Sequence, residues 1–564
     1  MLKRCLLFFI CLALLVGCKT ETEKVEKKIT AIGGVRYGGD FRFMSKEKVK
    51  QLFPLSITDV YANRVSSQIF EGLLKVDPST MAVVPALAES YEISDDAKTF
   101  TFHLREDVYF HDDDCFPDGK GRAVNADDFV FMFELACSKH ELNSIAWLLK
   151  GKILGARAYY NGEADHLEGV EAVDAKTLKI RLVQPFTGFY KVITHYGLSV
   201  FPKEAYEKYG NEIILNPVGT GAFILDELTD EGVILKRNNN YWGRDEFNNQ
   251  LPFLDRVIMT YSKNKTDELM SFRAGEIDLV LDIPVEEVDN VLGTLQEAQE
   301  GKNIKHKVDS KSSLNIKYFG FAHDSEEFSS KEVRMAFNLA IDRHAIVETW
   351  LEGEGWVIEH GFVPKMKGYP HKEVKGYSFN LEKAKSLMKK AGYPEGKNFP
   401  GVDLYVNATE GSAAHKLAQG VVFSLKQNLG VNINIKLCTI AEREEALQKG
   451  EAIFWRTGWI ADYPDPENFL SLFYGGNIEH SHTNVNPFKY ESEKFDALFE
   501  KALREQDNVK RMELFAKCDQ IIIDDAVVMP LITDDFVTMV NQKIRRFVTN
   551  KMEQLDFSNV FIKE

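Results

Sequence analysis

The sequence predicts an α/β protein that folds into several domains. Its 564 residues exceed what one hydrophobic core usually supports, and the length suggests about three or four domains. With 44% hydrophobic and 12% aromatic residues, the composition is globular. Apolar residues recur at helical spacing in some stretches and at every second position in others. Around residues 417–437 the two patterns follow each other across a glycine, which is typical of an α/β fold.

The first residues resemble an export signal. Lys3 and Arg4 precede an apolar run over residues 5–16, which is shorter than the roughly 20 residues that span a bilayer. We therefore expect residues 1–17 to be a signal peptide. Leu15-Val16-Gly17-Cys18 resembles the lipobox of bacterial lipoproteins and predicts lipidation of Cys18; the alternative is a plain signal with a chance cysteine. Residues 18–32 are charged and suit a flexible tether.

Charge and cysteine usage exclude some classes of function. The net charge is −16, and it becomes −18 when the two signal-peptide cations are removed. No basic stripe interrupts this acidity, so we expect no nucleic-acid binding. Four cysteines lie beyond the lipobox without CxxC or other metal spacing, so no metal site or cofactor is predicted. Their pairing stays open, with buried thiols the commoner outcome; they are Cys115, Cys137, Cys438 and Cys518.

Elements in the first half are predicted from alternation and from turn residues. Residues 63–71 read as a helix ended by Gly72. Residues 99–104 and 178–182 alternate apolar and polar side chains and are predicted strands. Between them, His111-Asp112-Asp113-Asp114-Cys115 could suggest a metal site. The Pro and Gly residues at 117, 119 and 121 favour a hydrated hairpin turn instead.

The second half contains three amphipathic helices. Residues 333–341 place apolar side chains on one helical face. Residues 417–429 form a second stripe that Gly430 should stop, and alternation over 431–437 predicts the strand that follows. Residues 495–503 form the third stripe.

The stretch 455–470 combines aromatic residues, charges and two prolines. It reads Trp-Arg-Thr-Gly-Trp-Ile-Ala-Asp-Tyr-Pro-Asp-Pro-Glu-Asn-Phe-Leu. Pro464 and Pro466 disfavour helix before them, so we predict an ordered loop. Aromatic walls with a few charges suit a small-molecule cleft. The alternative is that these aromatics cap the edge of a core.

This stretch resembles the signature loop of the family 5 extracellular solute-binding proteins, the dipeptide- and oligopeptide-binding components of bacterial ABC importers. Further phrases at similar spacing extend the resemblance over nearly the whole chain after residue 33. They include Glu71-Gly72-Leu73, Ala126-Asp127-Asp128-Phe129, residues 216–223 and Asn238-Asn239-Asn240-Tyr241-Trp242-Gly243.

The resemblance implies a two-lobed, type II periplasmic-binding-protein-like clamp. Each lobe would have a mixed β-sheet, and a subdomain would be inserted in the first. Mapped onto this sequence, the first lobe comprises 33–75, 194–310 and 525–564. The insert is 76–193 and the second lobe is 311–524. Hinge crossings are expected near Thr194 and Ser310.

The family pattern also implies a binding site. The aspartate matching Asp462 receives the α-amino group of a peptide; the alternative is that Asp462 caps the turn at Tyr463-Pro464. Arg456 and His415 match positions beside the ligand, and Gly458 and Trp459 match the lining. Four positions depart from the family pattern, so the pocket should be remodelled and one disulfide absent; they are Ser313, Asn315, Ile440 and Ile460.

Three functions are compatible with the sequence. The first is a lipid-anchored, monomeric binding protein that captures extended peptides and delivers them to an ABC permease. The second is the same clamp with a non-peptide solute, such as a metal chelate, sugar, haem or opine. The third is an exported hydrolase, against which the sequence has no GxSxG or HExxH motif, although a carboxylate pair stays open. The sequence favours the first and predicts no enzyme.

Overall fold

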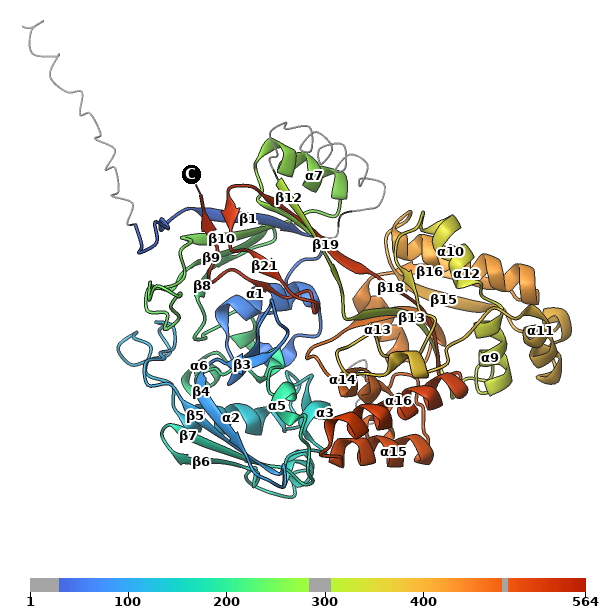
Figure 1. Cartoon of the computed structure of the whole chain (residues 1–564), viewed down its shortest axis with the longest axis horizontal. Helices are drawn as coiled ribbons and strands as arrows, with labels where there is room; N and C mark the ends of the chain where they lie inside the picture. Colours follow the sequence, from blue (N-terminus) through green and yellow to red (C-terminus); the bar gives the residue numbers. More distant parts are fainter. Residues whose placement is uncertain (1–29, 282, 284–305, 479–484, 564) are drawn as a thin grey trace, which may run out of the picture.

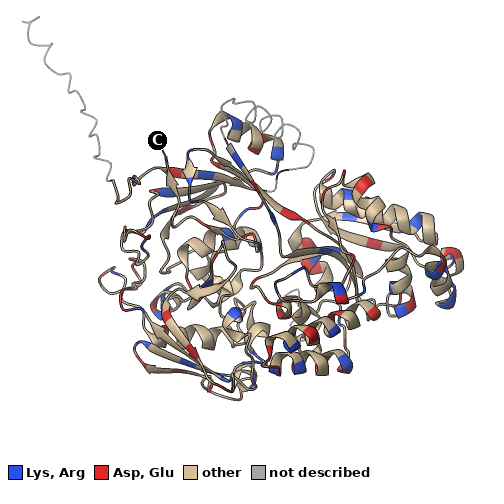
Figure 2. Cartoon of the chain, viewed as in Figure 1, with Lys and Arg blue, Asp and Glu red and all other residues tan. Residues whose placement is uncertain are grey.

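A computed structural model describes residues 30–281, 283, 306–478 and 485–563 (Figure 1). The predicted signal peptide, Cys18 and nearly all of the tether lie outside these residues. The described chain forms two large mixed sheets and a smaller antiparallel sheet, each covered by helices. Basic and acidic residues are intermixed along all three parts (Figure 2).

The first large sheet is assembled from distant parts of the chain. Its seven strands run in the order β12-β19-β11-β1-β10-β9-β8. The central strand β1 is parallel to β10 and β11, whereas the outer pairs are antiparallel. The bounds are β1 Asp40–Ser45, β8 Phe223–Leu228, β9 Gly232–Arg237, β10 Arg256–Tyr261, β11 Leu279–Leu281, β12 His306–Ser312 and β19 Asp535–Asn541. Helices α1 Val60–Ile69 and α7 Lys265–Ala274 contact this sheet, whereas Tyr206 of α6 Lys203–Tyr209 packs on Phe131 within residues 126–136.

The second large sheet has six strands in the order β14-β18-β13-β17-β15-β16. Here β15 is parallel to both of its neighbours, and the other pairs are antiparallel. The strands are β13 Asn315–Phe321, β14 Trp356–Val357, β15 Val402–Asn407, β16 Ile433–Cys438, β17 Phe454–Ile460 and β18 Val528–Thr533. The helices are α9 Lys331–Leu339, α10 Arg343–Trp350, α11 Leu381–Lys390, α12 Ala413–Leu429, α13 Ile440–Gln448, α14 Pro466–Leu470, α15 Glu493–Arg504 and α16 Asn508–Asp524.

Local sequence accounts for several of these elements. In α12, Ser412 caps the N-terminus through the backbone N–H of His415. Gly430 ends the helix with a φ of +72°, a conformation that glycine adopts without strain. The predicted stripe of Leu417 and Val421 faces the core. In the same core, Phe321 and Phe454 stack across neighbouring strands with ring centroids 5.2 Å apart.

The smaller antiparallel sheet lies within the predicted insert. Its strands run β4-β5-β7-β6, and β5 shows the predicted alternation of buried and half-buried residues. The bounds are β4 Ala88–Ile93, β5 Thr99–Leu104, β6 Val170–Asp174 and β7 Thr177–Arg181, with helices α2 Ala126–Ala136, α3 Ala146–Leu149, α4 Ala156–Tyr160 and α5 Phe189–Val192. Short hairpins complete the fold: β2 Leu74–Val76, β3 Val83–Pro85, β20 Ile544–Arg545, β21 Val548–Thr549, β22 Leu555–Asp556 and β23 Phe561–Ile562.

The chain passes between the two large sheets at two adjacent places. One is the link between β12 and β13 at residues 313–314, and the other is Asp534 between β18 and β19. The second crossing follows β18, so the predicted boundary at Asp525 would assign β18 to the first lobe, although it pairs with β13 of the second sheet. The other domain boundaries stay predictions.

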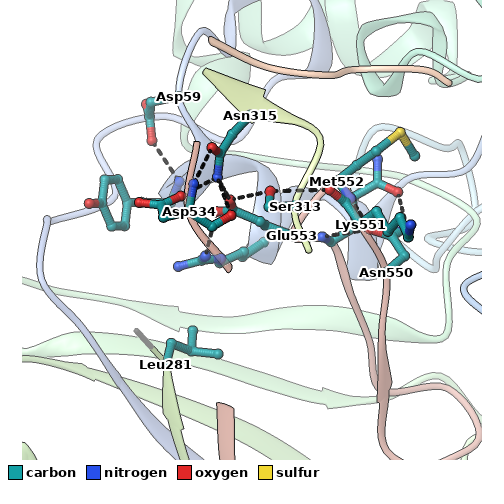
Figure 3. A network of polar contacts seen from close by, with 12 residues as sticks. Asp59, Leu281, Ser313, Asn315, Asp534, Asn550, Lys551, Met552 and Glu553 are labelled. Atoms are coloured by element: carbon teal, nitrogen blue, oxygen red, sulfur yellow. Dashed lines mark hydrogen bonds and ion pairs between the residues drawn. The ribbon is translucent and has the colours of Figure 1, made fainter. Parts of the chain in front are cut away.

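Polar side chains connect these two crossings (Figure 3). Ser313 Oγ donates to Glu553 Oε1 at 2.7 Å, and Asn315 Nδ2 donates to the same oxygen at 3.0 Å. Asn315 also donates to the Asp534 carboxylate and accepts from the Asp534 backbone N–H. Ser313 and Asn315 are two of the positions that depart from the family pattern. Asn315 is also the register partner of Ile460, a third such position.

Two local predictions differ from the structure. Helix α1 ends at Ile69, and Gly72 lies in a bridge to Ser199 instead of ending the helix. A Cβ at Gly72 would meet the Leu198 carbonyl oxygen at 3.3 Å, so this glycine permits close approach. Residues up to Ile460 in the predicted loop form strand β17, because the prolines constrain only the residues next to them.

The acidic turn at residues 111–115 contains a buried histidine. His111 is 2% exposed, and its Nε2 lies 2.9 Å from the carbonyl oxygen of Gly221. Burial lowers the pKa of His111 to about 4. Among the described residues, no group of three or more His, Cys, Asp or Glu side chains is placed to hold a metal ion. Free thiols occur at Cys115, Cys137, Cys438 and Cys518.

Candidate functional site

A cavity of about 240 Å³ lies between the two large sheets. One wall comes from the start of α1 and the turn at Met552 and Gln554. The opposite wall is the end of β17 with the residues after it, together with the start of α13. Arg456, Gly458, Trp459 and Asp462 all line this cavity, so the structure brings together four of the five predicted site residues.

Strand β17 presents an unpaired edge toward the cavity. On one side it pairs with β13 over its whole length, from Phe454 to Ile460. On the other side, within the described chain, β15 pairs only with residues 454–456. Alternate residues of a strand direct their backbone groups to opposite sides. Along residues 457–460, the backbone groups that point away from β13 therefore meet no strand of the described chain. A side chain at Gly458 would meet the Ile316 carbonyl oxygen at 3.1 Å.

Asp462 is a buried carboxylate without a cationic partner among the described residues. Its side chain is 15% exposed, and Oδ2 accepts a hydrogen bond from Asn468 Nδ2 at 3.1 Å. Burial raises the pKa of Asp462 to about 7, against a smaller lowering by Asn468. The cap of the following turn and helix is Asp465, whose carboxylate accepts from the backbone N–H of Glu467. Asp465, and not Asp462, is thus the cap of helix α14.

Asn468 also orients the aromatic wall of the cavity. Its Oδ1 accepts hydrogen bonds from Trp459 Nε1 at 2.8 Å and from the Asp462 backbone N–H at 3.2 Å. Trp455, by contrast, is fully buried and stacks on Phe488 with centroids 5.7 Å apart. The two readings of this stretch therefore both apply, since Trp459 faces the cavity and Trp455 belongs to the core.

The other end of the cavity is basic. Arg456 points its guanidinium into a buried environment, and its Nε has no hydrogen-bond partner within the described chain. Burial, reinforced by the nearby charge of Arg443, lowers the pKa of Arg456 to about 10. Arg443 is held by Asn407 at 2.8 Å and by Glu444 at 2.6 Å. A buried guanidinium with an unused donor favours an anionic partner.

His415 lies apart from the other predicted site residues. It is in the first turn of α12, and its Nδ1 accepts the backbone N–H of Gly411 at 3.0 Å. Its neighbours Ser412 and Lys416 line a second cavity, of about 360 Å³, that also reaches Tyr61. Tyr61 borders both cavities, so His415 is near a continuation of the cleft and not at the Asp462 end.

Sequence reasoning missed the residues that approach Asp462 from the far side of the cleft. His195 Nε2 lies 3.8 Å from Asp462 Oδ2, and the adjacent Tyr196 lines the cavity. Both precede the link back into the first sheet, where no motif or periodicity marks them. Arg443 was missed for the same reason. Asn468 belongs to the quoted phrase 466–470, but nothing in the sequence indicates its role as a double acceptor.

Comparison with known proteins identifies the fold. The sequence profile described as bacterial extracellular solute-binding proteins, family 5 Middle, matches residues 82–481. This chain belongs to that family. The solute-binding protein is 28% identical over 495 residues to the periplasmic oligopeptide-binding protein OppA of Escherichia coli, covering 86% of this chain and 85% of the relative. It is also 29% identical to heme-binding protein A of Haemophilus influenzae over 480 residues, covering 83% and 82%.

A solved structure shares the whole architecture. The solute-binding protein superposes with a TM-score of 0.80 on the periplasmic binding protein DppA from Helicobacter pylori, described as ABC transporter-associated and in complex with the peptide STSA. The two are 26% identical, and the match covers 94% of this chain and 99% of the other. The predicted type II periplasmic-binding-protein fold is thus confirmed. In the described part of the chain, no helix has the length and apolarity needed to cross a membrane.

Proposed function

We propose that this solute-binding protein captures extended peptides between its two lobes and delivers them to an ABC permease. The observation that carries the proposal is Asp462, a buried carboxylate facing the cavity with no cation beside it among the described residues. Every unblocked peptide has a cationic α-amine, so this carboxylate can bind the feature that peptides of all sequences share. Inside a closed cleft, the carboxylate–ammonium attraction exceeds its value in water.

Two further features support a peptide over other solutes. The unpaired edge of β17 can pair with an extended backbone, as peptide-binding domains do when a ligand adds a strand. Arg456 offers a donor for a carboxylate of the same ligand. Relatives named oligopeptide-binding and dipeptide-binding protein agree with this assignment.

Isothermal titration calorimetry tests the role of Asp462 with tri-alanine and its N-acetyl form. Asp462→Asn keeps the shape and removes the charge. It should weaken tri-alanine by about 30-fold or more, since leaving one partner of a buried pair alone costs about 2–5 kcal/mol. N-acetyl-tri-alanine should bind the wild type poorly, and its affinity should fall much less in Asp462→Asn. Asp230→Asn, on the exposed surface, is the matched control. Equal affinity of the wild type for both peptides would remove Asp462 from the site.

A second candidate function is the binding of a non-peptide solute in the same clamp. Such solutes include metal chelates, sugars, haem and opines. The relative named heme-binding protein A favours haem among them. Native mass spectrometry of the purified protein separates the candidates, because co-purified peptides and a co-purified haem differ in mass. Haem would also give its own visible absorption band.

We further propose that Cys18 carries a lipid that anchors the protein to a membrane. In this proposal the protein is a monomer, and its partner is the permease. The lipobox-like end of the signal supports the anchor. Cys18→Ala should abolish the lipid mass addition in protein extracted from membranes. An unchanged mass addition in the mutant would contradict lipidation at this residue.

A further inference from the structure

The carboxylate of Asp462 is approached from the far side of the cleft by His195. Asp462 follows β17 in the second sheet, whereas His195 follows α5 and leads back toward the first sheet. Asp462 Oδ2 lies 3.8 Å from His195 Nε2. The same oxygen accepts the hydrogen bond from Asn468 on its own side. One carboxylate oxygen is therefore enclosed between groups from the two sides of the clamp.

The orientation of His195 is fixed by its surroundings. The backbone N–H of Gly197 donates to His195 Nδ1 at 3.0 Å, so Nδ1 is an acceptor and the proton of the neutral ring is on Nε2. The side chain is 3% exposed and stacks on Tyr196 with centroids 4.5 Å apart. Burial lowers the pKa of His195 to about 3, so the ring is neutral near pH 7. A neutral ring in this tautomer presents an N–H dipole to Asp462.

We propose that His195 is a positioning residue for the amine subsite, where its Nε2–H dipole, 3.8 Å away, favours the ionised form of Asp462. The proposal rests on the proposed function, since it assigns the Asp462 end to the ligand amine. The same two segments are also joined by the ion pair of Lys191 with Asp465 at 2.9 Å, so His195 and Asp462 are held in a fixed relative position.

Within the described residues, no other charged group supplies this stabilisation from the elements packed against Asp462. The titratable side chains facing Asp462 in the described chain are His195, Tyr196 and Tyr463, and burial raises the pKa of both tyrosines well above its usual value. Asp59 acts on Tyr196 from the start of α1. A histidine with only a packing role would, when replaced, reduce stability and leave the pH dependence of Asp462 unchanged.

Three substitutions separate these roles by chemistry. His195→Gln can place an N–H near the Nε2 position. His195→Asn reaches only the Nδ1 position, so it can accept from Gly197 without approaching Asp462. His195→Leu removes both nitrogens. His111→Leu is the matched control for loss of a buried histidine, because His111 bonds Gly221 in the acidic turn and is absent from the cavity lining.

Calorimetry with tri-alanine between pH 5 and pH 8 gives the readout. Affinity should fall on the acid side as Asp462 is protonated. This acid limb should move upward by about 0.5–1 pH unit in His195→Asn and His195→Leu, which is a three- to tenfold loss of affinity at pH 6. In His195→Gln and His111→Leu the acid limb should stay at the wild-type pH. The affinity for N-acetyl-tri-alanine should be unchanged by all four substitutions. If His195→Leu fails to fold, the Asn and Gln variants decide alone.

A wild-type limb in His195→Asn would overturn the proposal while the peptide function stands. If the wild type itself binds no peptide, the proposed function fails, and the pH dependence of unfolding of the unliganded protein still tests His195. There, Asp462→Asn should remove more pH dependence between pH 4 and pH 8 in the His195→Asn background than in the wild type. Equal removal would reject the role of His195.

Discussion

At the scale of single residues, Asp462 is arranged for binding at the expense of folding. Its carboxylate is buried, with one hydrogen bond from Asn468 and no cation beside it in the described chain. Asp519 is also buried and has a pKa raised to about 6 by burial, but it accepts from two backbone N–H groups and from Tyr369. Asp519 thus receives its hydrogen bonds from the protein, whereas Asp462 has one such donor and can accept further ones from a ligand.

Asp462→Asn should therefore stabilise the unliganded protein at pH 7.5 by about 2–4 kcal/mol and have little effect at pH 4. The folded-state pKa of about 7 lies above the unfolded value. The stability that the protonated group contributes is present below about pH 4 and is lost as the pH rises through 7. Urea denaturation at the two pH values measures the difference.

Asp519→Asn is the contrasting variant. An amide cannot accept all the hydrogen bonds that the carboxylate receives, so this change should destabilise the protein at both pH values. A destabilising Asp462→Asn at pH 7.5 would contradict the view that this carboxylate is held without adequate partners.

The site could be predicted from the sequence only where it is contiguous in the chain. Arg456, Gly458, Trp459 and Asp462 occur within seven residues, so one recognisable phrase gives all four. His195 and Arg443 reach the cavity through tertiary folding, which no local pattern encodes. His415 was predicted beside the ligand because the resemblance matches its position in the sequence. The resemblance does not predict where the side chain lies in the fold, which is near the second cavity.

At the scale of elements, α14 is held by buried ion pairs that join it to the insert and to α16. Asp465 accepts from Arg511 at 2.7 and 3.0 Å and from Lys191 at 2.9 Å. Asp465 and Arg511 are each 1% exposed. In addition, Lys152 lies 3.1 Å from Glu467. Burial alone would raise the pKa of Asp465, but the cations of Arg511 and Lys191 lower it to about 2.

Arg511→Met should lower the free energy of unfolding by about 3–5 kcal/mol, because it leaves the buried Asp465 carboxylate with Lys191 alone. Adding Asp465→Asn to this variant should recover much of the loss, since the uncompensated charge is then removed. Urea denaturation near pH 7 measures both.

Lys489→Met provides the surface comparison. Its partner Asp324 is about half exposed, and such pairs contribute about 0–1 kcal/mol. If Arg511→Met were as mild as Lys489→Met, the ion pairs around α14 would have no structural importance.

Elements with a clear period were predictable, and those defined by partners were not. The stripe over residues 417–429 and its glycine stop gave α12 correctly. Residues 454–460 form a strand because they pair with β13 and β15. The prolines that follow them led to the prediction of a loop instead. Gly72 resembled a helix stop, but its role depends on the distant Leu198.

At the scale of the whole molecule, the two large sheets are joined by two crossings that lie side by side. The side chain of Asn315 connects them, because it bonds both Asp534 of the second crossing and Glu553 (Figure 3). Glu553 also accepts from Ser313, and Arg64 lies 3.9 Å from its second oxygen. Both crossings are short, so we expect the sheets to rotate about this point as rigid bodies, with the polar network limiting the direction of motion.

Small-angle X-ray scattering should record a smaller radius of gyration when tri-alanine is added to protein stripped of ligand by unfolding and refolding. The physical reason is that enclosure of the peptide draws the two lobes together. Adding tri-alanine to Asp462→Asn at the same concentration should produce less compaction. An unchanged curve at saturating ligand would indicate a rigid cleft.

The type II fold followed from phrases spread along the chain, whereas the exact crossings did not. The predicted crossing at Ser310 lies within β12, and the predicted boundary at Asp525 precedes β18. Boundaries of this kind depend on which sheet accepts a strand, and β18 joins β13 through backbone pairing that is independent of its side chains.

The unpaired edge of β17 also bears on solubility. An open strand edge is the kind of surface along which protein chains aggregate. Here the edge lines a cavity of about 240 Å³ between the two large sheets, a volume far smaller than a folded sheet. The enclosure thus acts as a size filter, admitting short segments of backbone and keeping other copies of the protein from pairing along the same strand.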